Sequence, residues 1–452
     1  MRSGRTHPSG QSSAARWRIG WVVAGTMAVG LFAGMLLAAA PFIRARESEV
    51  MGAVLCGFAV GWGLLALLSV RFTDQPQRGA VAPALFMGVS GLLLAWFGAP
   101  VDIVVSWVWP PVLLALVIWM FFRSRQQLHS RSRRWVLYPV IAVLALASLG
   151  GAYQTLGAAA DAGAFPMPGQ LVDVGGYSLH LNCTGTGSPT VLLQPGAGEM
   201  SSNHALLSTA VSGRTRVCVY DRAGRGWSGP ADTVQDATQI AADLHTLLHS
   251  GNVPGPYVLA GHSFGGLYVQ TFAANYPDEV AGMVLIDSTD RAPAPVPRPV
   301  AVRGGYDLLG RVTAFISILG RVGALRLYAP FEDVNSLPPH QRGEVRANIA
   351  DAGNMRSTLD EYVQANTSME EAASLQDFAG KPLVVLTAGV GNDAKHEASQ
   401  NGLATLSANS LHKTIDFASH EALVAEPDAA AITAQAILDV VGSVRTAVPL
   451  AK

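Results

Sequence analysis

Charged residues are scarce in this sequence of 452 residues: they make up 14% of the chain, whereas hydrophobic residues make up 50%. The formal net charge is -1, which gives no electrostatic reason to expect a nucleic-acid partner. Internal repeats and long low-complexity runs are also absent from the sequence. The shortage of charge is uneven, because charges are sparse before about residue 169 and ordinary after it. This split predicts a membrane region followed by one large soluble domain.

Five apolar stretches occupy the first third of the chain, and charges are nearly absent within them. They cover residues 19–40, 50–70, 81–97, 103–122 and 135–152. Most approach the ~20 residues that a helix needs to cross ~30 Å of hydrocarbon. The first stretch is long for a signal peptide and four more follow it, so we expect it to be retained. The sequence therefore predicts a transmembrane region of five helices over residues 1–155, followed by a linker at 156–169.

Arginine placement predicts how these spans are oriented. With the N-terminus in the cytoplasm, the outer segments hold only Arg44 and Arg46. The inner segments hold eleven arginines: Arg2, Arg5, Arg16, Arg18, Arg71, Arg78, Arg123, Arg125, Arg131, Arg133 and Arg134. An odd number of spans then places the chain after about residue 151 outside the cytoplasm, in a multi-pass integral membrane protein. No span carries a central ionisable residue, which argues against a transporter and favours an anchor or an assembly surface, with a sensor role left open.

From residue 171 the pattern changes to short apolar runs that alternate with helical segments. Strand-like runs cover residues 171–176, 177–185, 190–196, 216–221, 257–260, 282–288 and 381–389. Helical spacing is found at residues 237–251 and again at 427–444. Such alternation predicts a parallel sheet covered on both faces, here over residues 170–445. A helical insert at about residues 290–377 breaks the rhythm, and its position after a strand favours a cap over the site rather than a peripheral insert.

A serine stands between a strand and a helix in the run YVLAGHSFGGLYVQTFAANYP, residues 257–277. Gly261 and Gly265 lie two positions before and after Ser263, which lets strand and helix approach closely around a strained turn. A serine hydroxyl needs a base to take its proton and donors to stabilise the oxyanion that it creates. In this context the Gly-x-Ser-x-Gly pattern predicts a nucleophile elbow, with Ser263 as the nucleophile.

The base is expected to be a late histidine, because the chain order serine, acid, histidine goes with this motif. His420 lies in a loop before the final helix and is the predicted base. The acid should orient the imidazole, and Asp393, which follows the strand at 381–389, fits best. Asp287, after the preceding strand, is the main competitor, and Glu397 is a weaker one. The alternative role of Asp393 is to cap a turn.

Two backbone N–H groups are expected to stabilise the oxyanion. Phe264, directly after the nucleophile, supplies one of them. The other is predicted at Ala197, in the glycine-rich loop at 194–198. The glycines of this loop could equally be ordinary turn residues.

Other polar residues near these motifs are expected to have no chemical role. His245 and His249 are four residues apart, which suits metal ligation, but without further ligands we expect a solvated helix face. His262 is expected to line the pocket. Asp221 and Arg222 end a strand and are expected to lock the loop that follows it.

Residues from about 171 to 444 resemble the α/β-hydrolase superfamily, notably in the runs YDRAGRGWSG and GHSFGGLYVQTFAANYPDEVAGMVLIDS. The resemblance covers about three fifths of the chain. It implies an eight-stranded, mostly parallel sheet with a helical cap, and no metal or organic cofactor. It also implies a triad of Ser263, Asp393 and His420, each carried over by its place in the pattern.

Two features depart from the pattern of this superfamily. Gln194 and Pro195 stand where many members have His-Gly, and Asp393 lies later after its strand than is usual, which keeps Asp287 open as the acid. Serine at the elbow argues against members that use aspartate there, such as haloalkane dehalogenases and epoxide hydrolases.

The usual strand order of the superfamily also bears on the cysteines. Cys183 ends the second strand of the soluble part and Cys218 begins the fourth, and in that order the two strands are antiparallel neighbours. The two thiols could therefore form a disulfide, which would agree with an external domain. The alternative is two buried free thiols.

Together these features predict a membrane-anchored serine hydrolase that cleaves an ester, or an amide, through an acyl-enzyme. A small molecule with an apolar acyl group is the expected substrate and the lipid bilayer the expected partner. Peptidase and thioesterase activity stay open, and no oligomeric state is predicted. The alternative from another class is a membrane protein whose hydrolase-like domain binds a ligand or a partner without turnover.

Overall fold

The computed structural model describes residues 19–451, apart from 74, 128–130, 232 and 292–306. The chain forms two compact units. The first comprises Met1–Thr155 with Tyr306–Phe315, and the second comprises Leu156–Gly305 with Ile316–Lys452. Some of the arginines that set the predicted orientation lie in residues 1–18, outside the described residues.

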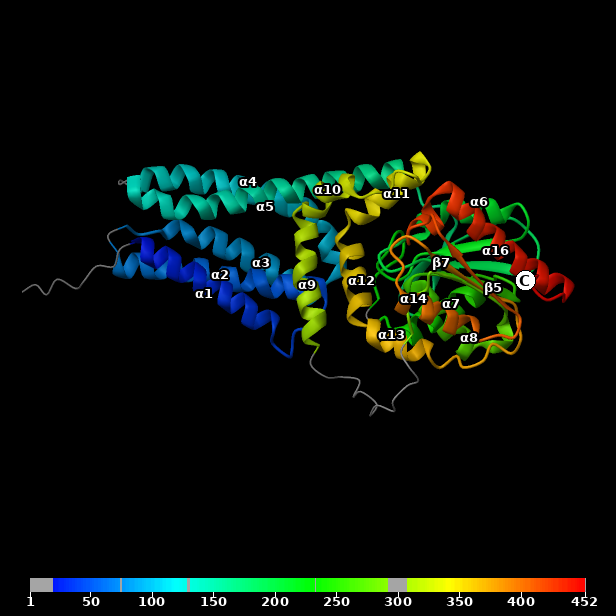
Figure 1. Cartoon of the computed structure of the whole chain (residues 1–452). Coiled ribbons are helices and arrows are strands. Elements are labelled where there is room, and N and C mark those ends of the chain that lie inside the picture. Colours follow the sequence, from blue (N-terminus) through cyan, green and yellow to red (C-terminus); the bar gives the residue numbers. More distant parts are fainter. Residues whose placement is uncertain (1–18, 74, 128–130, 232, 292–306, 452) are drawn as a thin grey trace, which may run out of the picture. The chain divides into compact units, whose positions relative to one another are not determined.

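The first unit is built from long apolar helices (Figure 1). They are α1 (Ile19–Ala38), α2 (Glu47–Phe72), the short η1 (Arg78–Ala80), α3 (Val81–Phe97), α4 (Ala99–Gln127) and α5 (Arg131–Ala164). Within the part of the chain that the structure describes, five helices are long and apolar enough to cross a membrane, as the hydropathy of the sequence predicts. The predicted linker at 156–169 differs from the structure, because α5 continues through its first part as far as Ala164.

Helices α1 and α2 pack through glycines spaced four residues apart on each helix. A Cβ added to Gly57 would lie 2.2 Å from the Cα of Gly34, and one added to Gly30 would lie 2.9 Å from the Cα of Gly61. Side chains at these positions would force the backbones apart. Close backbone contact through small residues is how apolar helices associate where lipid removes the hydrophobic drive.

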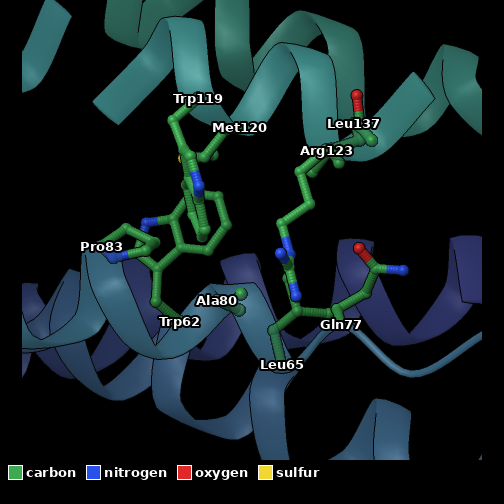
Figure 2. Close-up of a pocket in the computed structure, with 11 residues that line it drawn as sticks. Trp62, Leu65, Gln77, Ala80, Pro83, Trp119, Met120, Arg123 and Leu137 are labelled. Atoms are coloured by element: carbon green, nitrogen blue, oxygen red, sulfur yellow. The ribbon is translucent and has the colours of Figure 1, made fainter. Parts of the chain in front are cut away.

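A small pocket opens among the helices of the first unit (Figure 2). Trp62 and Pro83 line it from one side, and Trp119, Met120 and Arg123 line it from α4. Its volume of about 30 Å³ holds no more than a few water molecules. The pocket is therefore too small for an organic substrate.

The second unit contains one eight-stranded sheet in the order β1-β2-β4-β3-β5-β6-β7-β8. Its strands are β1 (Gln170–Asp173), β2 (Ser178–Thr184), β3 (Thr190–Gln194), β4 (Val217–Tyr220), β5 (Tyr257–His262), β6 (Val280–Ile286), β7 (Leu383–Ala388) and β8 (Ser410–Ile415). Strand β2 runs antiparallel to both of its neighbours, β1 and β4, and the pairs from β4 to β8 are all parallel. The predicted eight-stranded, mostly parallel sheet is thus confirmed, and its central strands are buried along their whole length, as parallel strands covered on both faces must be.

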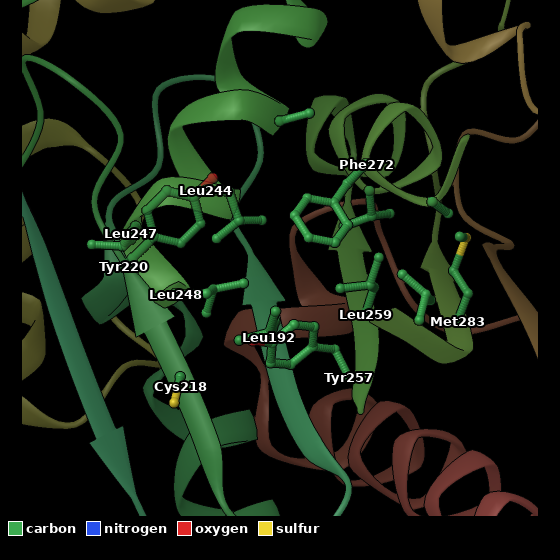
Figure 3. Close-up of a cluster of buried hydrophobic side chains, with 14 of the residues drawn as sticks. Leu192, Cys218, Tyr220, Leu244, Leu247, Leu248, Tyr257, Leu259, Phe272 and Met283 are labelled. Carbon is green, nitrogen blue, oxygen red and sulfur yellow. The ribbon is translucent and has the colours of Figure 1, made fainter. Parts of the chain in front are cut away.

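Helices cover both faces of this sheet. They are η2 (Ser201–His204), α6 (Ala205–Ser212), α7 (Ala237–Ser250), α8 (Phe264–Asn275), η3 (Pro277–Glu279), α14 (Ala394–Ala404), α15 (Ala422–Ala425) and α16 (Pro427–Thr446). On one face, side chains of α7 and α8 such as Leu244, Leu247 and Phe272 pack on Leu192 and Leu259 of the sheet (Figure 3). On the other face, α6 and α16 bury the alternate residues of the same strands. The two-residue period of each strand therefore feeds two separate cores.

A helical insert separates β6 from β7, where the sequence predicts a cap at about 290–377. It comprises α9 (Leu308–Arg321), α10 (Ala324–Tyr328), η4 (Ala329–Phe331), α11 (Pro339–Ile349), α12 (Ala352–Val363) and α13 (Ala365–Ala372). The first part of the expected cap, residues 292–306, lies outside the described residues. Helices α9 and α10 with η4 also form an apolar pair bent by 65°, which composition alone would allow as a sixth membrane segment.

Candidate active site

Ser263 stands between β5 and α8 with φ 54° and ψ -123°, a backbone conformation that residues other than glycine rarely adopt. Such a conformation costs a non-glycine residue on the order of 1–3 kcal/mol and needs support from its surroundings. The Ser263 N–H donates to the carbonyl of Ile286 (3.1 Å), and the Ser263 carbonyl accepts the N–H groups of Gly266 (3.0 Å) and Thr289 (3.1 Å). These bonds fix the serine at the carboxyl edge of the sheet.

The glycines on either side of Ser263 are required by close backbone contacts. A Cβ on Gly261 would lie 2.5 Å from the carbonyl oxygen of Gly265. A Cβ on Gly265 would lie 2.2 Å from the carbonyl oxygen of Gln194, at the end of β3. The close approach of strand and helix that the sequence predicts at this turn is therefore present.

The carboxylate that meets His420 belongs to Asp287, which follows β6. His420 Nδ1 lies 2.6 Å from Asp287 Oδ2, in a hydrogen bond between residues 133 positions apart. Asp287 has a positive φ of 44°, its N–H donates to the carbonyl of Leu386 (2.7 Å), and its Oδ1 accepts the N–H of Ala388 (3.0 Å). Burial alone would raise the pKa of the Asp287 carboxyl, but hydrogen bonds from His420, from a second histidine and from Ala388 lower it to about 2. Asp287 is thus an ionised acceptor held against an imidazole.

The preference for Asp393 as the partner of His420 is not supported by this geometry. Asp393 is exposed and caps α14, where its Oδ1 accepts the N–H of His396 (2.8 Å). That is the turn-capping alternative, and it suits an aspartate at a helix N-terminus. Glu397, the weaker candidate, instead bonds Asn392 Nδ2 (2.6 Å).

A second histidine shares the Asp287 carboxylate. His396 Nε2 lies 3.0 Å from Asp287 Oδ1, and its Nδ1 lies 3.1 Å from Asp290 Oδ1. Carboxylates only accept hydrogen bonds, so both nitrogens of His396 must carry protons to satisfy both contacts. Partial burial lowers the pKa of His396, but the bonds to Asp287 and Asp290 outweigh it and the net shift is upward. Sequence reasoning missed this residue, because nothing in the local pattern distinguishes it from a surface histidine.

His262 was expected to line the pocket, but in the structure its side chain joins two loops. Its Nδ1 lies 3.1 Å from Glu199 Oε2, and its Nε2 lies 3.1 Å from the backbone carbonyl of His420. Burial lowers the pKa of His262, but the charge of Glu199 more than offsets this and raises it. The rings of His262 and His420 lie 4.5 Å apart, centroid to centroid. Since Ser263 follows His262 directly, the His420 loop is held beside the serine.

Glu199 lies at the centre of a buried hydrogen-bond network in the loop after β3. Its Oε2 accepts the N–H of Gly196 (2.5 Å) and lies 3.2 Å from His204 Nε2. Ligand atoms of Glu199, His204 and His262 lie within 4.8 Å of one another, a spacing that a metal ion could use. Because one oxygen, Oε2, already faces three donors, we assign the cluster as a hydrogen-bonded network rather than as a metal site.

His245 and His249 do have a further candidate ligand, which the sequence analysis did not foresee. Glu279 Oε1 lies 2.9 Å from His245 Nε2 and 3.3 Å from His249 Nε2. The three residues are partly exposed, and their ligand atoms lie within 4.8 Å of one another. The group lies at the surface between α7 and η3, and none of its three residues belongs to the Ser263 site.

Arg222 holds the backbone of the loop after β3 through two hydrogen bonds. Its guanidinium donates to the carbonyls of Pro195 (2.7 Å) and Gly196 (2.6 Å). It also donates to Glu361 Oε1 (2.7 Å) on α12 of the insert, and Arg225 pairs with the same carboxylate (2.8 Å). Arg222 was expected to lock only the loop that follows it. Its longest-range contact, across 139 positions, could not be read from the sequence.

Asp221 does lock the following loop, as expected. Its Oδ2 accepts the N–H of Trp227 (3.2 Å) and lies 2.8 Å from His180 Nδ1. Its Oδ1 accepts the N–H of Ser201 (2.6 Å), so it also ties η2 to the end of β4.

The two predicted oxyanion donors come from segments that border Ser263. Phe264 begins α8, and the first N–H groups of a helix have no intrahelical partner. A Cβ added to Gly196 would lie 3.0 Å from the Cβ of Ser263, which brings the loop that contains Ala197 against the serine. The backbone N–H groups of Phe264 and of this loop therefore belong to segments that lie beside Ser263.

Cys183 and Cys218 stand opposite each other in the antiparallel pair of β2 and β4 and are joined by a disulfide. The third cysteine, Cys56, is free and lies in α2. A disulfide in the second unit fits an oxidising compartment.

Comparison with known proteins was made by sequence and by structure. A family model described as the alpha/beta hydrolase fold matches residues 189–329. An uncharacterized protein of Schizosaccharomyces pombe is 31% identical over 156 residues, 28% of this chain and 29% of that protein. The putative carbamate hydrolase RutD of Azorhizobium caulinodans is 29% identical over 156 residues, 34% of this chain and 57% of that protein. The chain therefore spans less than two thirds of the length of these curated relatives.

Among solved structures, a thermophilic esterase from Thermogutta terrifontis aligns with 61% of this chain and 98% of its own, at 22% identity and a TM-score of 0.45. The family match covers β3 to β6 and includes the turn that carries Ser263. The sheet order, the helices on both faces and this match lead to one conclusion. The second unit has the α/β-hydrolase fold, and the described residues before it include five helices that are long and apolar enough to cross a membrane.

Proposed function

We propose that this protein is a membrane-anchored serine hydrolase in which Ser263 is the nucleophile, His420 the base and Asp287 the acid. The observation that carries the proposal is the 2.6 Å hydrogen bond between His420 Nδ1 and Asp287 Oδ2, at the sheet edge where the strained Ser263 stands. In this proposal Asp287 replaces Asp393, which the sequence favoured as the acid. An ionised acid of this kind orients the imidazole and stabilises its charged form during the reaction.

The proposed reaction has two halves. Ser263 Oγ attacks the carbonyl carbon of an ester or amide while its proton passes to His420 Nε2. The N–H groups of Phe264 and Ala197 stabilise the oxyanion, and the intermediate collapses when His420 gives the proton to the leaving alcohol or amine. Water then attacks the acyl-enzyme with His420 again as the base, which releases the acid and restores Ser263.

The insert is proposed to cover the site and to set the specificity. Tyr362 of α12 meets the ring of Phe264, next to the nucleophile, with centroids 5.3 Å apart. Glu361 on the same helix binds Arg222, which holds the backbone of the loop at 194–198, called here the oxyanion loop. These contacts support a pocket lined by the insert, and we propose that it takes a small substrate with an apolar acyl group.

The membrane placement supports the same proposal. Five apolar helices precede the hydrolase domain, and we propose that they anchor it as a multi-pass protein. The arginine bias puts the hydrolase domain on the extracytoplasmic side, and the disulfide between Cys183 and Cys218 agrees with that side.

Fluorophosphonate labelling of the full-length protein tests the proposal. The wild type and a Ser212→Ala control, altered at a partly exposed serine at the end of α6, should both be labelled, and Ser263→Ala should not. Absence of labelling in the folded wild type would favour the alternative, a hydrolase-like domain that binds without turnover. A panel of p-nitrophenyl esters, acyl-CoAs and aminoacyl amides would then separate esterase, thioesterase and peptidase activity.

A further inference from the structure

Helix α9 of the insert presents its large apolar side chains outward and its small or polar ones inward. The exposed residues are Leu308, Leu309, Val312, Phe315, Ile316 and Leu319. The buried residues are Gly310, Arg311, Thr313, Ala314, Ser317 and Gly320. A helix on the surface of a soluble domain has the opposite arrangement, with its apolar stripe toward the core. The inverted pattern indicates a surrounding medium that is not water.

Large apolar side chains are also exposed after the bend at Gly323. Leu327, Tyr328 and Phe331 are exposed by 64%, 53% and 82%. The bent pair formed by α9 and by α10 with η4 is apolar enough to pass for a membrane segment. Apolar patches of this extent on a water-soluble surface normally mark a site of contact with a partner or a membrane.

The start of α9, as far as Phe315, belongs to the first unit, where its inner face contacts α1 and α2. The Arg311 guanidinium donates to the carbonyl of Ala38, the last residue of α1, at 2.8 Å, and also to the carbonyl of Ile43. Ala314 belongs to one buried cluster with Ala38, Val50 and Ala53. The start of α9 therefore packs at the ends of α1 and α2 that the loop between them joins. That contact makes α9 continuous with helices that themselves suit a bilayer.

The length of α9 decides between a span and a shallower segment. Its 14 residues cover about 21 Å at the 1.5 Å rise of an α-helix, whereas the hydrocarbon core is about 30 Å thick. After α9 the chain bends by 65° into α10 instead of continuing across. Helix α9 alone is therefore too short to cross, and the bend turns the chain aside before it could do so. A bent pair of this kind suits a segment that enters the bilayer without spanning it.

We infer that α9 and α10 with η4 form a re-entrant segment whose exposed face lies among the acyl chains of the leaflet at the α1–α2 loop. Bilayer lipid is the occupant that the inverted pattern and the continuity with α1 and α2 favour over a second copy of the chain. The hydrolase insert thus contributes a membrane surface in addition to the five N-terminal helices. This inference goes beyond the proposed hydrolase activity and stands whether or not Ser263 is reactive.

Environment-sensitive labelling of the full-length protein in lipid nanodiscs tests this inference. A nitrobenzoxadiazole probe is attached at Phe315→Cys in a Cys56→Ala background, which leaves the disulfide intact. Lipids with a doxyl group on the acyl chain should quench most of the emission, and aqueous iodide should quench little. The matched control is Gln435→Cys on the exposed side of α16, where iodide should quench and doxyl lipids should not.

Two outcomes would overturn the inference. Quenching by iodide at Phe315→Cys as strong as at the control would place α9 in water. Protection from both quenchers would show that protein covers the face, as in a contact with a second copy. Leu319→Cys on the same face and Leu327→Cys on α10 repeat the measurement if a label at Phe315 prevents folding, since both side chains are exposed.

Discussion

Replacing Asp287 by asparagine separates the two candidate acids. The change keeps the shape of the side chain but removes the charge 2.6 Å from His420 Nδ1. An ion pair at about 4 Å is worth about 4 kcal/mol at an effective dielectric constant of about 20. Because about 1.4 kcal/mol corresponds to a factor of ten in rate, kcat should fall about 10³-fold. An amide that holds the imidazole in the wrong tautomer would bring the loss toward about 10⁴-fold, the size known for a serine protease.

The assay is hydrolysis of a p-nitrophenyl ester by the full-length protein, with the rate of fluorophosphonate labelling as a second measure. Asp393→Asn is the matched control, because asparagine caps a helix as well as aspartate does and Asp393 is exposed. Its activity should stay within about twofold of the wild type, since a surface cap contributes nothing to the reaction. Thermal unfolding confirms that each variant is folded. The reasoning would be refuted by a folded Asp287→Asn variant of near-normal activity beside an inactive Asp393→Asn variant.

Four further changes test other contacts of the second unit. Glu361→Gln strands two buried guanidinium groups and should cost about 3–5 kcal/mol in chemical unfolding, whereas Asp360→Asn, in a partly exposed pair on the same helix, should cost less than about 1 kcal/mol. Because the pKa of His396 is raised, its pairing with Asp287 and Asp290 stabilises the protein below about pH 6.5, and this stabilisation is lost as pH rises through the pKa of the folded state. The melting temperature of His396→Gln should therefore approach that of the wild type from pH 6 to pH 9. Burial lowers the pKa of His412 in β8, so this histidine destabilises the folded protein at low pH. The melting temperature of His412→Gln should therefore fall relative to that of the wild type as pH rises from 6 to 9. Cys183→Ser should cost about 4 kcal/mol for a loop that spans 35 positions, and an unchanged melting temperature under oxidising conditions would speak against the disulfide.

The sheet, the membrane helices and the serine turn could be predicted from local patterns. Hydropathy marks the spans, strand and helix periods mark the α/β domain, and two glycines beside Ser263 mark the close turn. The choice of acid could not be predicted in this way, because β6 and β7 are parallel neighbours and both end at the same edge. Two local features decide between the two aspartates. Asp287 has a positive φ and its carboxylate meets His420, whereas the carboxylate of Asp393 caps α14.

The remaining parts of the site were unpredictable because they depend on contacts between distant segments. Glu361 reaches Arg222 across 139 positions, and His396 reaches Asp287 across 109. Each of these residues looks ordinary in its own stretch of sequence. The inverted faces of α9 were equally hidden, because the sequence shows only that the segment is apolar, and burial is needed to show which side faces inward.

The arginine between the insert and the oxyanion loop has a mechanical consequence. The same guanidinium of Arg222 grips the carbonyls of Pro195 and Gly196 and the carboxylate of Glu361. If α12 swung away to admit a substrate, that guanidinium would lose its counter-charge and its grip on the loop would loosen. Opening of the insert and assembly of the proposed oxyanion donors would then be coupled, and the proposed enzyme would be active only while the insert is closed over a bound substrate.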